Sequence, residues 1–437
     1  SVLLPDAPLL QQGVEHLRGV VDGELAGFHA GDSVDLLGDL VAPAAAANPG
    51  EFDYSDYLRG RRTRALVRCG NTAAVQPCND ALGAEPGWGV ARLSGAAERV
   101  LISRLPTGQA EIAVALLLGR YELLEEDVTE RYMRTGTMHI LAISGQHLAI
   151  LAGFLWLILR FVPIPRKWGA IMLGLIVVSY ALLTGARPPV LRAAVLVCVL
   201  IGAIVLDVRS RRANPLALAL IIVLALNPSD LFDRGLQLSF LAVAALSWIV
   251  RPAWTWLQGT PDPLHQLLAD IRPLWQRAVL AAGRAVLFAF VMSGVVWLAN
   301  VPLLASRFHV FSPIAVPLTA ILTPVVTVAL IAGLGLLVLD PWLPKLTLLL
   351  AKICGWGVAA MDWSVQEGAK VPGGHWYVAG PPDWWVSVFY LGMAGVLLFR
   401  PVGRVRWRWF SAAVAWLALG FALPALRSAP DNLECQI

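Results

Sequence analysis

Four polar side chains occur within nine residues at the start of the first long apolar run: His139, Ser144, Gln146 and His147. Polar groups at membrane depth are costly, so such residues either serve a function or join helices. If residues 139–162 form one helix at about 100° per residue, Gln146, His139 and His147 lie within about a right angle of one another, with Ser144 just beyond. The sequence therefore predicts one hydrogen-bonding face, and it leaves open whether this face lines an aqueous path or only joins helices.

Ser144 beside an imidazole also suggests a nucleophile and its base, as in an intramembrane serine peptidase. Ser144 and His147 share the predicted helix, whereas a productive base normally approaches from elsewhere, so His309 would have to supply it. A small-solute or lipid transporter is a further alternative that hydropathy leaves open. His139 and His147 would lie about 12 Å apart along a helix axis, which excludes chelation of one metal ion by this pair alone.

Composition fixes the class of protein. The 437 residues are 57% hydrophobic and 15% charged, which is far too apolar for a soluble domain. The sequence predicts a mainly α, polytopic helical membrane protein. A net charge of +4 excludes a strongly basic nucleic-acid domain but permits a locally positive path. The chain starts at Ser1 without a signal peptide, and we expect both of its ends to be cut from a longer protein.

The apolar runs predict ten membrane spans, some of them shorter than the ~20 residues of a full crossing or broken. They are residues 139–162, 168–184, 190–207, 215–226, 236–250, 285–305, 312–339, 346–361, 384–399 and 408–424. Pro313, Pro317 and Pro324 leave open whether the seventh run is one span or two half-helices.

Loop charge predicts the sidedness of these spans. With ten crossings, one set of alternate loops collects most of the Arg and Lys residues and therefore faces the cytoplasm. The N-terminal domain and the C-terminus then lie outside the cytoplasm. The connection 251–284 mixes Trp and Leu with basic residues, which predicts an amphipathic stretch on the membrane surface or a docking site for a cytosolic motor.

Residues 1–104 carry short alternating runs punctuated by turn signals such as Asn48-Pro49-Gly50, which predict a small β domain. Cys69 and Cys78 are the only cysteines in it, and in an oxidising compartment they can form a disulfide if their side chains face each other. In residues 105–138 a short apolar run precedes an acidic stretch. Because that run is too short to span, we expect amphipathic or interfacial helices there.

The segment 139–147 resembles the signature of the ComEC family of competence proteins, with Gln146 where the family usually has Leu. Further motifs follow in the family's order. They are residues 187–192, residues 233–242 with Leu236 in place of Phe, the polar-then-Pro pattern of Trp297, Asn300 and Pro302, and the aromatic-rich turn 308–312. Thr319 stands where the family usually has Asn. Residues 48–58 resemble part of the family's N-terminal OB-like domain, a small β-barrel that often binds oligonucleotides.

The resemblance implies that residues 139–427 form a channel for single-stranded DNA in the bacterial cytoplasmic (inner) membrane, used in natural transformation. The residues that would line it are His139, Ser144, Gln146, His147, Arg187, Arg192, Gln237, Ser239, Phe240 and Asn300. Arginine can hold a phosphate in a bidentate fork, amide and hydroxyl groups hold a backbone without trapping it, and an aromatic ring can stack on a base.

The partners that follow are single-stranded DNA and the lipid bilayer. A periplasmic DNA receptor, a cytosolic helicase-type motor and a homo-oligomer stay open. No enzyme activity, cofactor or metal is expected, since the chain has no Walker-type loop and no clustered His-x-His-x-Asp-His pattern. The family often carries a C-terminal metallo-β-lactamase-like domain, and we expect residues 428–437 to begin a linker toward it.

Overall fold

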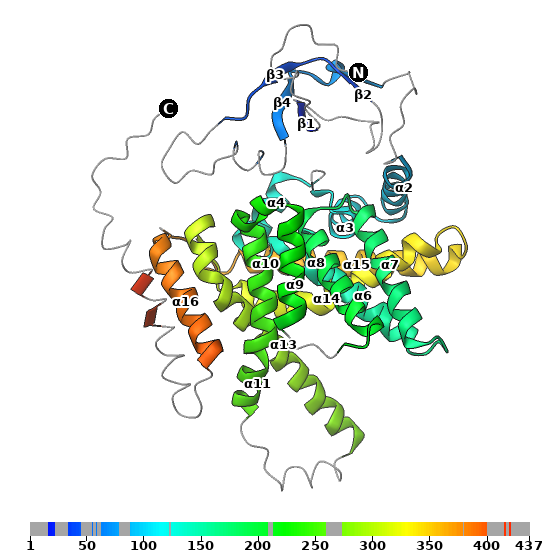
Figure 1. Ribbon diagram of the computed structural model, residues 1–437. Coiled ribbons are helices and arrows are strands. Elements are labelled where there is room, and N and C mark those ends of the chain that lie inside the picture. Colours follow the sequence, from blue (N-terminus) through cyan, green and yellow to red (C-terminus); the bar gives the residue numbers. More distant parts are fainter. Residues whose placement is uncertain are drawn as a thin grey trace, which may run out of the picture. The chain divides into compact units, whose positions relative to one another are not determined.

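The computed structural model describes residues 16–21, 34–44, 55, 58, 63–77, 88–121, 124–208, 213–258, 273–378, 380–399, 415–416 and 419–420. The chain divides into two compact units (Figure 1). The first comprises Ser1–Ala97 with Pro430–Ile437, and the second is Glu98–Ala429.

Short strands make up about half of the described part of the first unit. They are β1 (His16–Val21), β2 (Val34–Leu36), β3 (Asp39–Val41), β4 (Thr63–Cys69) and β5 (Val75–Pro77). One sheet has the order β1-β4-β3, with β1 parallel and β3 antiparallel to β4, and β2 pairs antiparallel with β5. The region is therefore β-rich as predicted, while its OB-like topology and the segment 48–58 stay predictions.

One expectation for this region differs from the structure, and a second stays a prediction. The β domain was predicted to reach residue 104, but helix α2 occupies Trp88–Arg104. Buried residues recur in it at helical spacing, at Ser94, Ala97, Glu98 and Leu101, although Ser94-Gly95 reads as a turn signal in the sequence. The other expectation is the disulfide: Cys69 is a buried free cysteine in the structure. Cys78 lies outside the described residues, so its pairing with Cys69 stays a prediction.

The second unit is helical. Its helices are α3 (Gln109–Leu118), α4 (Glu126–Arg134), α5 (Met138–Leu141), α6 (Gly145–Leu159), α7 (Arg166–Leu183), α8 (Pro188–Val205), α9 (Ala213–Leu226), α10 (Arg234–Ala245), α11 (Arg251–Gln258), α13 (Leu274–Phe308), α14 (Ala315–Leu339), α15 (Pro344–Ala369) and α16 (Asp383–Phe399). A 3-10 turn, Pro228–Phe232, precedes α10, and a π-helical turn, Leu246–Val250, joins α10 to α11. Two short strands, β6 (Val310–Phe311) and β7 (Trp376–Tyr377), pair antiparallel.

Six helical segments of the described chain are long and apolar enough to cross a membrane. They are Arg166–Leu183, Pro188–Val205, Arg234–Thr255, Leu274–Phe308, Ala315–Leu339 and Pro344–Ala369. Three further predicted spans coincide with the shorter helices α6, α9 and α16. The tenth, 408–424, falls almost wholly outside the described residues. The mainly α, polytopic membrane class is confirmed.

The predicted bounds are wrong at two helices. The connection predicted at 251–284 is shorter, because α11 continues the α10 helix and α13 starts at Leu274. Its place on the membrane surface or as a docking site for a cytosolic motor stays a prediction. At 35 residues α13 is about 52 Å long, well beyond the ~30 Å of a hydrocarbon core. Figure 1 shows α11 and the first half of α13 projecting away from the other helices. The Pro-rich seventh run is one helix, α14, with Pro324 in its interior.

Helix α3 lies in the core of the second unit. The sequence had suggested instead that it lies at the membrane interface. Ala113, Val114, Ala115, Leu116 and Leu117 are all fully buried. The helix packs against α14 and α15, and the carbonyl of Leu117 accepts a hydrogen bond of 2.9 Å from the Tyr180 hydroxyl of α7. A helix that is apolar on every side can be buried at any length, so shortness alone did not indicate a surface position.

Small residues hold α14 and α15 close together. A Cβ at Gly357 of α15 would lie 2.8 Å from the Cβ of Ala329 and 3.3 Å from its Cα. Small residues at helix contacts in membranes allow backbones to approach, and van der Waals packing then stabilises the pair. Helix α3 packs against both helices of this α14–α15 pair.

We expect Gly357→Ala to lower the thermal stability of the purified chain in detergent, because α14 and α15 must move apart. The cost of overpacking is about 1–3 kcal/mol. Gly153→Ala in α6 is the matched control, since a Cβ there meets nothing within 4 Å. That control should match the wild type or gain up to about 1 kcal/mol from helix propensity. Equal melting temperatures for Gly357→Ala and Gly153→Ala would contradict the close contact.

Candidate functional site

The apolar run that starts at residue 139 is not one helix. Helix α5 ends at Leu141, Ala142 has extended backbone (φ −71°, ψ 130°), and α6 starts at Gly145. Ser144, also extended (φ −120°, ψ 171°), is the N-cap of α6. The predicted single face that joins His139 to His147 is therefore wrong, because the two histidines lie on opposite sides of a break.

Ser144 and His147 close this break with a reciprocal cap. The Ser144 side chain accepts from the backbone N–H of His147, and the imidazole accepts from the backbone N–H of Ser144. His147 Nδ1 lies 3.2 Å from Ser144 N and 3.0 Å from Ser144 Oγ. Such a capping box satisfies two of the N–H groups that every helix start leaves open. Here the third position carries His instead of the usual Glu or Gln.

The cap fixes the state of the His147 ring. Because Nδ1 accepts from a backbone N–H, the neutral ring carries its proton on Nε2. The residue is 1% exposed, and Nε2 has no hydrogen-bond partner among the described residues. A buried donor without an acceptor lowers the stability of the folded chain. Nε2 is therefore the clearest candidate to donate a hydrogen bond to a ligand inside the helix bundle.

Gln146 faces a polar stripe on α14. Its Nε2 donates to Thr323 Oγ1 at 3.3 Å. Thr323 Oγ1 lies 2.7 Å from the Thr319 carbonyl, and Thr327 Oγ1 lies 2.7 Å from the Thr323 carbonyl. Residues spaced by four share one helix face, so Thr319, Thr323 and Thr327 line one side of α14. We call Ser144, Gln146 and His147 with these threonines the polar seam. Thr323 and Thr327 were missed in the sequence, although their spacing from Thr319 was visible.

The first turns of α8 lie beside the seam. A Cβ on Gly145 would contact the Cβ of Ala193 at 3.4 Å. The neighbouring Arg192 is 5% exposed, and its Nη1 lies 3.5 Å from Asp233 Oδ1. Arg192 is thus engaged with a protein carboxylate, and in this structure it acts as a link between α8 and α10 rather than as an open phosphate ligand.

Asp233 holds two groups at once. Its Oδ1 accepts from the Leu236 N–H at 2.8 Å and thereby caps α10. A Cβ on Gly235 would lie 3.0 Å from Arg192 Nη2 and 3.0 Å from Asp233 Oδ1, so a larger residue there would push against both members of the pair. Asp233 stands within the motif 233–242, but no local signal in the sequence indicated its pairing with a residue 41 positions earlier.

Arg187 and His139 lie at the ends of helices. Arg187 is the N-cap residue of α8, and its guanidinium lies 4.6 Å from the centre of the Tyr121 ring, a cation–π contact. The His139 side chain is exposed, with Nδ1 3.0 Å from the Gly136 carbonyl. Neither residue belongs to the polar seam.

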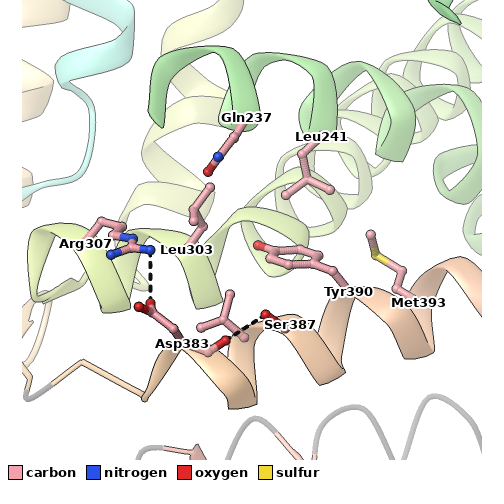
Figure 2. A pocket seen from close by; sticks show the side chains of 9 residues that line it. Gln237, Leu241, Leu303, Arg307, Asp383, Ser387, Tyr390 and Met393 are labelled. Carbon is pink, nitrogen blue, oxygen red and sulfur yellow. Dashed lines mark hydrogen bonds and ion pairs between the residues drawn. The ribbon is translucent and has the colours of Figure 1, made fainter. Parts of the chain in front are cut away.

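The predicted residues of α10 and α13 form a second group. Gln237 donates to the Leu231 carbonyl at 3.1 Å and lines a groove between α10, α13 and α16 (Figure 2). Ser239 and Phe240 are half-buried on α10. Asn300 lies on α13, and its buried Oδ1 has no hydrogen-bond partner among the described residues. Of the predicted site residues, Ser144, Gln146 and His147 therefore belong to the seam and Gln237 lines the groove, while the others lie outside both.

The aromatic-rich turn serves to fasten the helices. His309 adopts a left-handed conformation (φ 55°) after α13, and β6 then pairs with β7. His309 Nδ1 accepts from the Gly380 N–H at 3.2 Å, and the His309 carbonyl accepts from the Val378 N–H at 2.9 Å. These bonds tie His309 to Val378 and Gly380.

The Ser144 hydroxyl is paired with His147 in a cap, which gives no support to a serine peptidase.

Sequence reasoning also missed an acidic residue in an apolar helix. Asp362 lies in α15 near the buried Tyr132 of α4, and its Oδ1 is buried without a partner in the described chain. Burial, together with the Asp362 charge, raises the pKa of the Tyr132 phenol far above its usual range. Within the described residues, no group of three or more His, Cys, Asp or Glu side chains is arranged to hold a metal ion.

An apolar bundle with several membrane-crossing helices, interrupted by a polar helix break in its interior, defines a polytopic helical membrane protein. Residues 116–403 match the family model described as "Competence protein". A relative from Bacillus subtilis (strain 168), ComE operon protein 3, is 30% identical over 310 residues, which are 71% of this chain and 36% of that protein. The chain belongs to this competence protein family, the ComEC family that its motifs predicted.

The chain spans about a third of the length of that relative. No solved structure matches the chain. The family match covers the helix break, the polar seam and the groove, so all of the candidate site residues from His139 to Asn300 lie inside it.

The Arg192–Asp233 pair can be measured by a double-mutant cycle. Asp233→Ala should destabilise the chain strongly, since a buried guanidinium loses the Asp233 carboxylate and α10 loses its cap, at a cost of about 3–5 kcal/mol. In an Arg192→Met background the same change should cost about 1 kcal/mol, the cap alone. Thermal unfolding in detergent gives the difference.

The Lys370–Glu367 pair is the control cycle, because both side chains are well exposed, 62% and 45%. Its coupling should stay below about 1 kcal/mol. Equal couplings in the two cycles would mean that Arg192 and Asp233 do not depend on each other in the folded chain.

Proposed function

We propose that this chain takes part in DNA uptake during natural transformation, as the transmembrane channel that passes single-stranded DNA across the bacterial cytoplasmic membrane. The observation that carries the proposal is the interrupted helix α5–α6. Its break places the buried Nε2 donor of His147 in the polar seam, inside an otherwise apolar bundle. This break lies within the stretch that matches the competence family.

The chemistry of the seam suits a strand that must slide. Interrupted helices in transporters present half-helix N-termini to anionic groups, and the positive end of the α6 dipole lies at Ser144 and Gly145. Hydroxyl, amide and neutral imidazole groups offer hydrogen bonds to a sugar-phosphate backbone without the strong attraction of a free cation. A strand can therefore be held loosely and released.

The surroundings of the seam add positive charge. Arg192 is buried next to Ala193, which contacts the start of α6, and Arg187 begins the same helix α8. Arg192 contributes by field rather than by contact, since Asp233 holds it. A positive region with low-dielectric walls attracts a polyanion. The place of Ser239, Phe240 and Asn300 along the route stays part of the proposal.

Membrane sidedness and partners are part of the same proposal. The loop charges favour an extracytoplasmic N-terminal unit and C-terminus. That unit would receive DNA, through an OB-like surface and with the aid of a periplasmic DNA receptor, and a cytosolic helicase-type motor would draw the strand inward. A disulfide between Cys69 and Cys78 would fit the oxidising side. A homo-oligomer would be compatible with this arrangement.

Two substitutions separate the role of His147 in the cap from a role in transport. His147→Asn keeps an acceptor at the place of Nδ1 for the cap, but its side chain ends short of the place of Nε2, whereas His147→Leu removes both acceptor and donor. Loss of one hydrogen bond to a phosphate should lower DNA uptake roughly tenfold in either variant. Only His147→Leu should also lower the melting temperature. Transformation frequency is measured at matched membrane levels, and wild-type uptake by His147→Asn would remove Nε2 from the path.

Photocrosslinking tests whether the seam meets DNA. We expect a benzophenone side chain at Gln146 or at Thr327 to crosslink labelled single-stranded DNA during uptake. Leu175 of α7, which is 65% exposed, is the control position and should give no crosslink. Crosslinks of equal yield at all three positions, or none at the seam, would contradict a route along α6 and α14.

A further inference from the structure

The groove between α10, α13 and α16 is a cavity of about 400 Å³. Its lining changes character from one end to the other. Gln237, Arg307 and Asp383 lie at one end, and Leu241, Tyr390 and Met393 lie at the other (Figure 2). The groove is therefore amphipathic along its length.

The polar end coincides with the ends of the three helices. Helix α10 begins at Arg234, α13 ends at Phe308 and α16 begins at Asp383. In a membrane protein the ends of apolar helices mark the polar interface, and their interiors mark the hydrocarbon. The groove thus has its charged end at headgroup level and its apolar end at the depth of acyl chains.

Charge at the polar end favours an anion. Arg307 Nη2 pairs with Asp383 Oδ1 at 3.0 Å, and Arg234 Nη1 lies 3.5 Å from the Arg307 carbonyl. The N-termini of α10 and α16 point their positive dipoles to the same place. The negative groups nearby are Asp233, which already holds Arg192, and Asp383. The C-terminus of α13 adds a partial negative charge at this end. Two guanidinium groups and two helix starts together outweigh it and the one remaining carboxylate.

Arg307 can exchange its partner Asp383 for another anion at little cost in stability. The side chains are 40% and 72% exposed, and such exposed pairs contribute little to stability. A phosphate can therefore take Arg307 from Asp383 without leaving a charge buried. Arginine is well suited to this exchange, because its planar fork binds phosphate through two parallel hydrogen bonds.

We propose that this groove is a binding site for one anionic phospholipid of the surrounding bilayer. The phosphate lies between Arg234 and Arg307, and an acyl chain covers Leu241, Tyr390 and Met393. The same phosphate chemistry occurs in a DNA strand, but a strand needs a positive track along its whole length. This groove is charged only at one end, which favours the lipid.

Lipid titration into the purified chain in detergent tests the site by native mass spectrometry. Dioleoylphosphatidylglycerol should bind the wild type at least about tenfold more tightly than dioleoylphosphatidylcholine, the gain expected from a charge-assisted contact. Arg307→Gln should abolish this preference. Arg277→Gln, an exposed arginine of the same helix α13, is the matched control and should keep it.

A second pair of variants tests the acyl end without removing charge. Ser387 lines the groove on α16, whereas Val388 is 44% exposed and does not line it. Ser387→Trp should fill the groove and weaken binding of both lipids, and Val388→Trp should leave both unchanged. Thermal unfolding in detergent confirms that both variants are folded.

Three results would overturn the proposal. One is equal affinity of the wild type for the two lipids. Another is full lipid binding by Ser387→Trp. The third is competition by a 20-residue oligodeoxythymidine that displaces phosphatidylglycerol from the wild type and loses its own affinity in both Arg307→Gln and Ser387→Trp. That result would assign the groove to the DNA path.

Discussion

The start of α6 depends on one reciprocal contact, the cap between Ser144 and His147. A helix that begins inside an apolar bundle leaves N–H groups that lipid cannot satisfy, so the protein must supply the acceptors. Ser144 and His147 do so, and the same bonds fix the tautomer of the imidazole and the direction of its free donor. The break also turns Gln146 toward the threonines of α14. Local backbone chemistry and the candidate path are thus set by the same two side chains.

A second constraint links this start to α8 and α10. Gly145 at the first turn of α6 contacts Ala193, and the adjacent Arg192 reaches Asp233 at the cap of α10. The N-termini of α6 and α10 therefore both lie against the first turns of α8. Helix starts carry partial positive charge, and a buried guanidinium adds to it. Asp233 balances only part of this charge, since it also accepts the Leu236 N–H.

Hydropathy predicted the helices well but not their interruptions. The apolar runs located nine helices that the structure describes. A helix that crosses lipid can be recognised from the length and the apolar composition of its segment alone. The break at residues 142–144 contains no Pro or Gly, and a helical period drawn across it placed His139 and His147 on one face. The cap signal was present as Ser144 followed by a side chain acceptor at the third position, but that acceptor is His instead of Glu or Gln. Contacts such as Arg192 with Asp233 have no local signature, since they depend on how α8 and α10 pack.

The cost of burying Arg192 argues that this region has a purpose other than stability. A buried ion pair rarely stabilises a fold more than apolar residues of the same size, because both charges lose water. Here the carboxylate is one-third exposed and lies 3.5 Å from a guanidinium that is 5% exposed. Leu or Met at position 192 would pack α8 against α10 at less expense. What an aliphatic residue cannot supply is a fixed positive field beside the start of α6, where the donor of His147 lies without a partner. Both this field and this donor would lower the free energy of a polyanion that passes the start of α6.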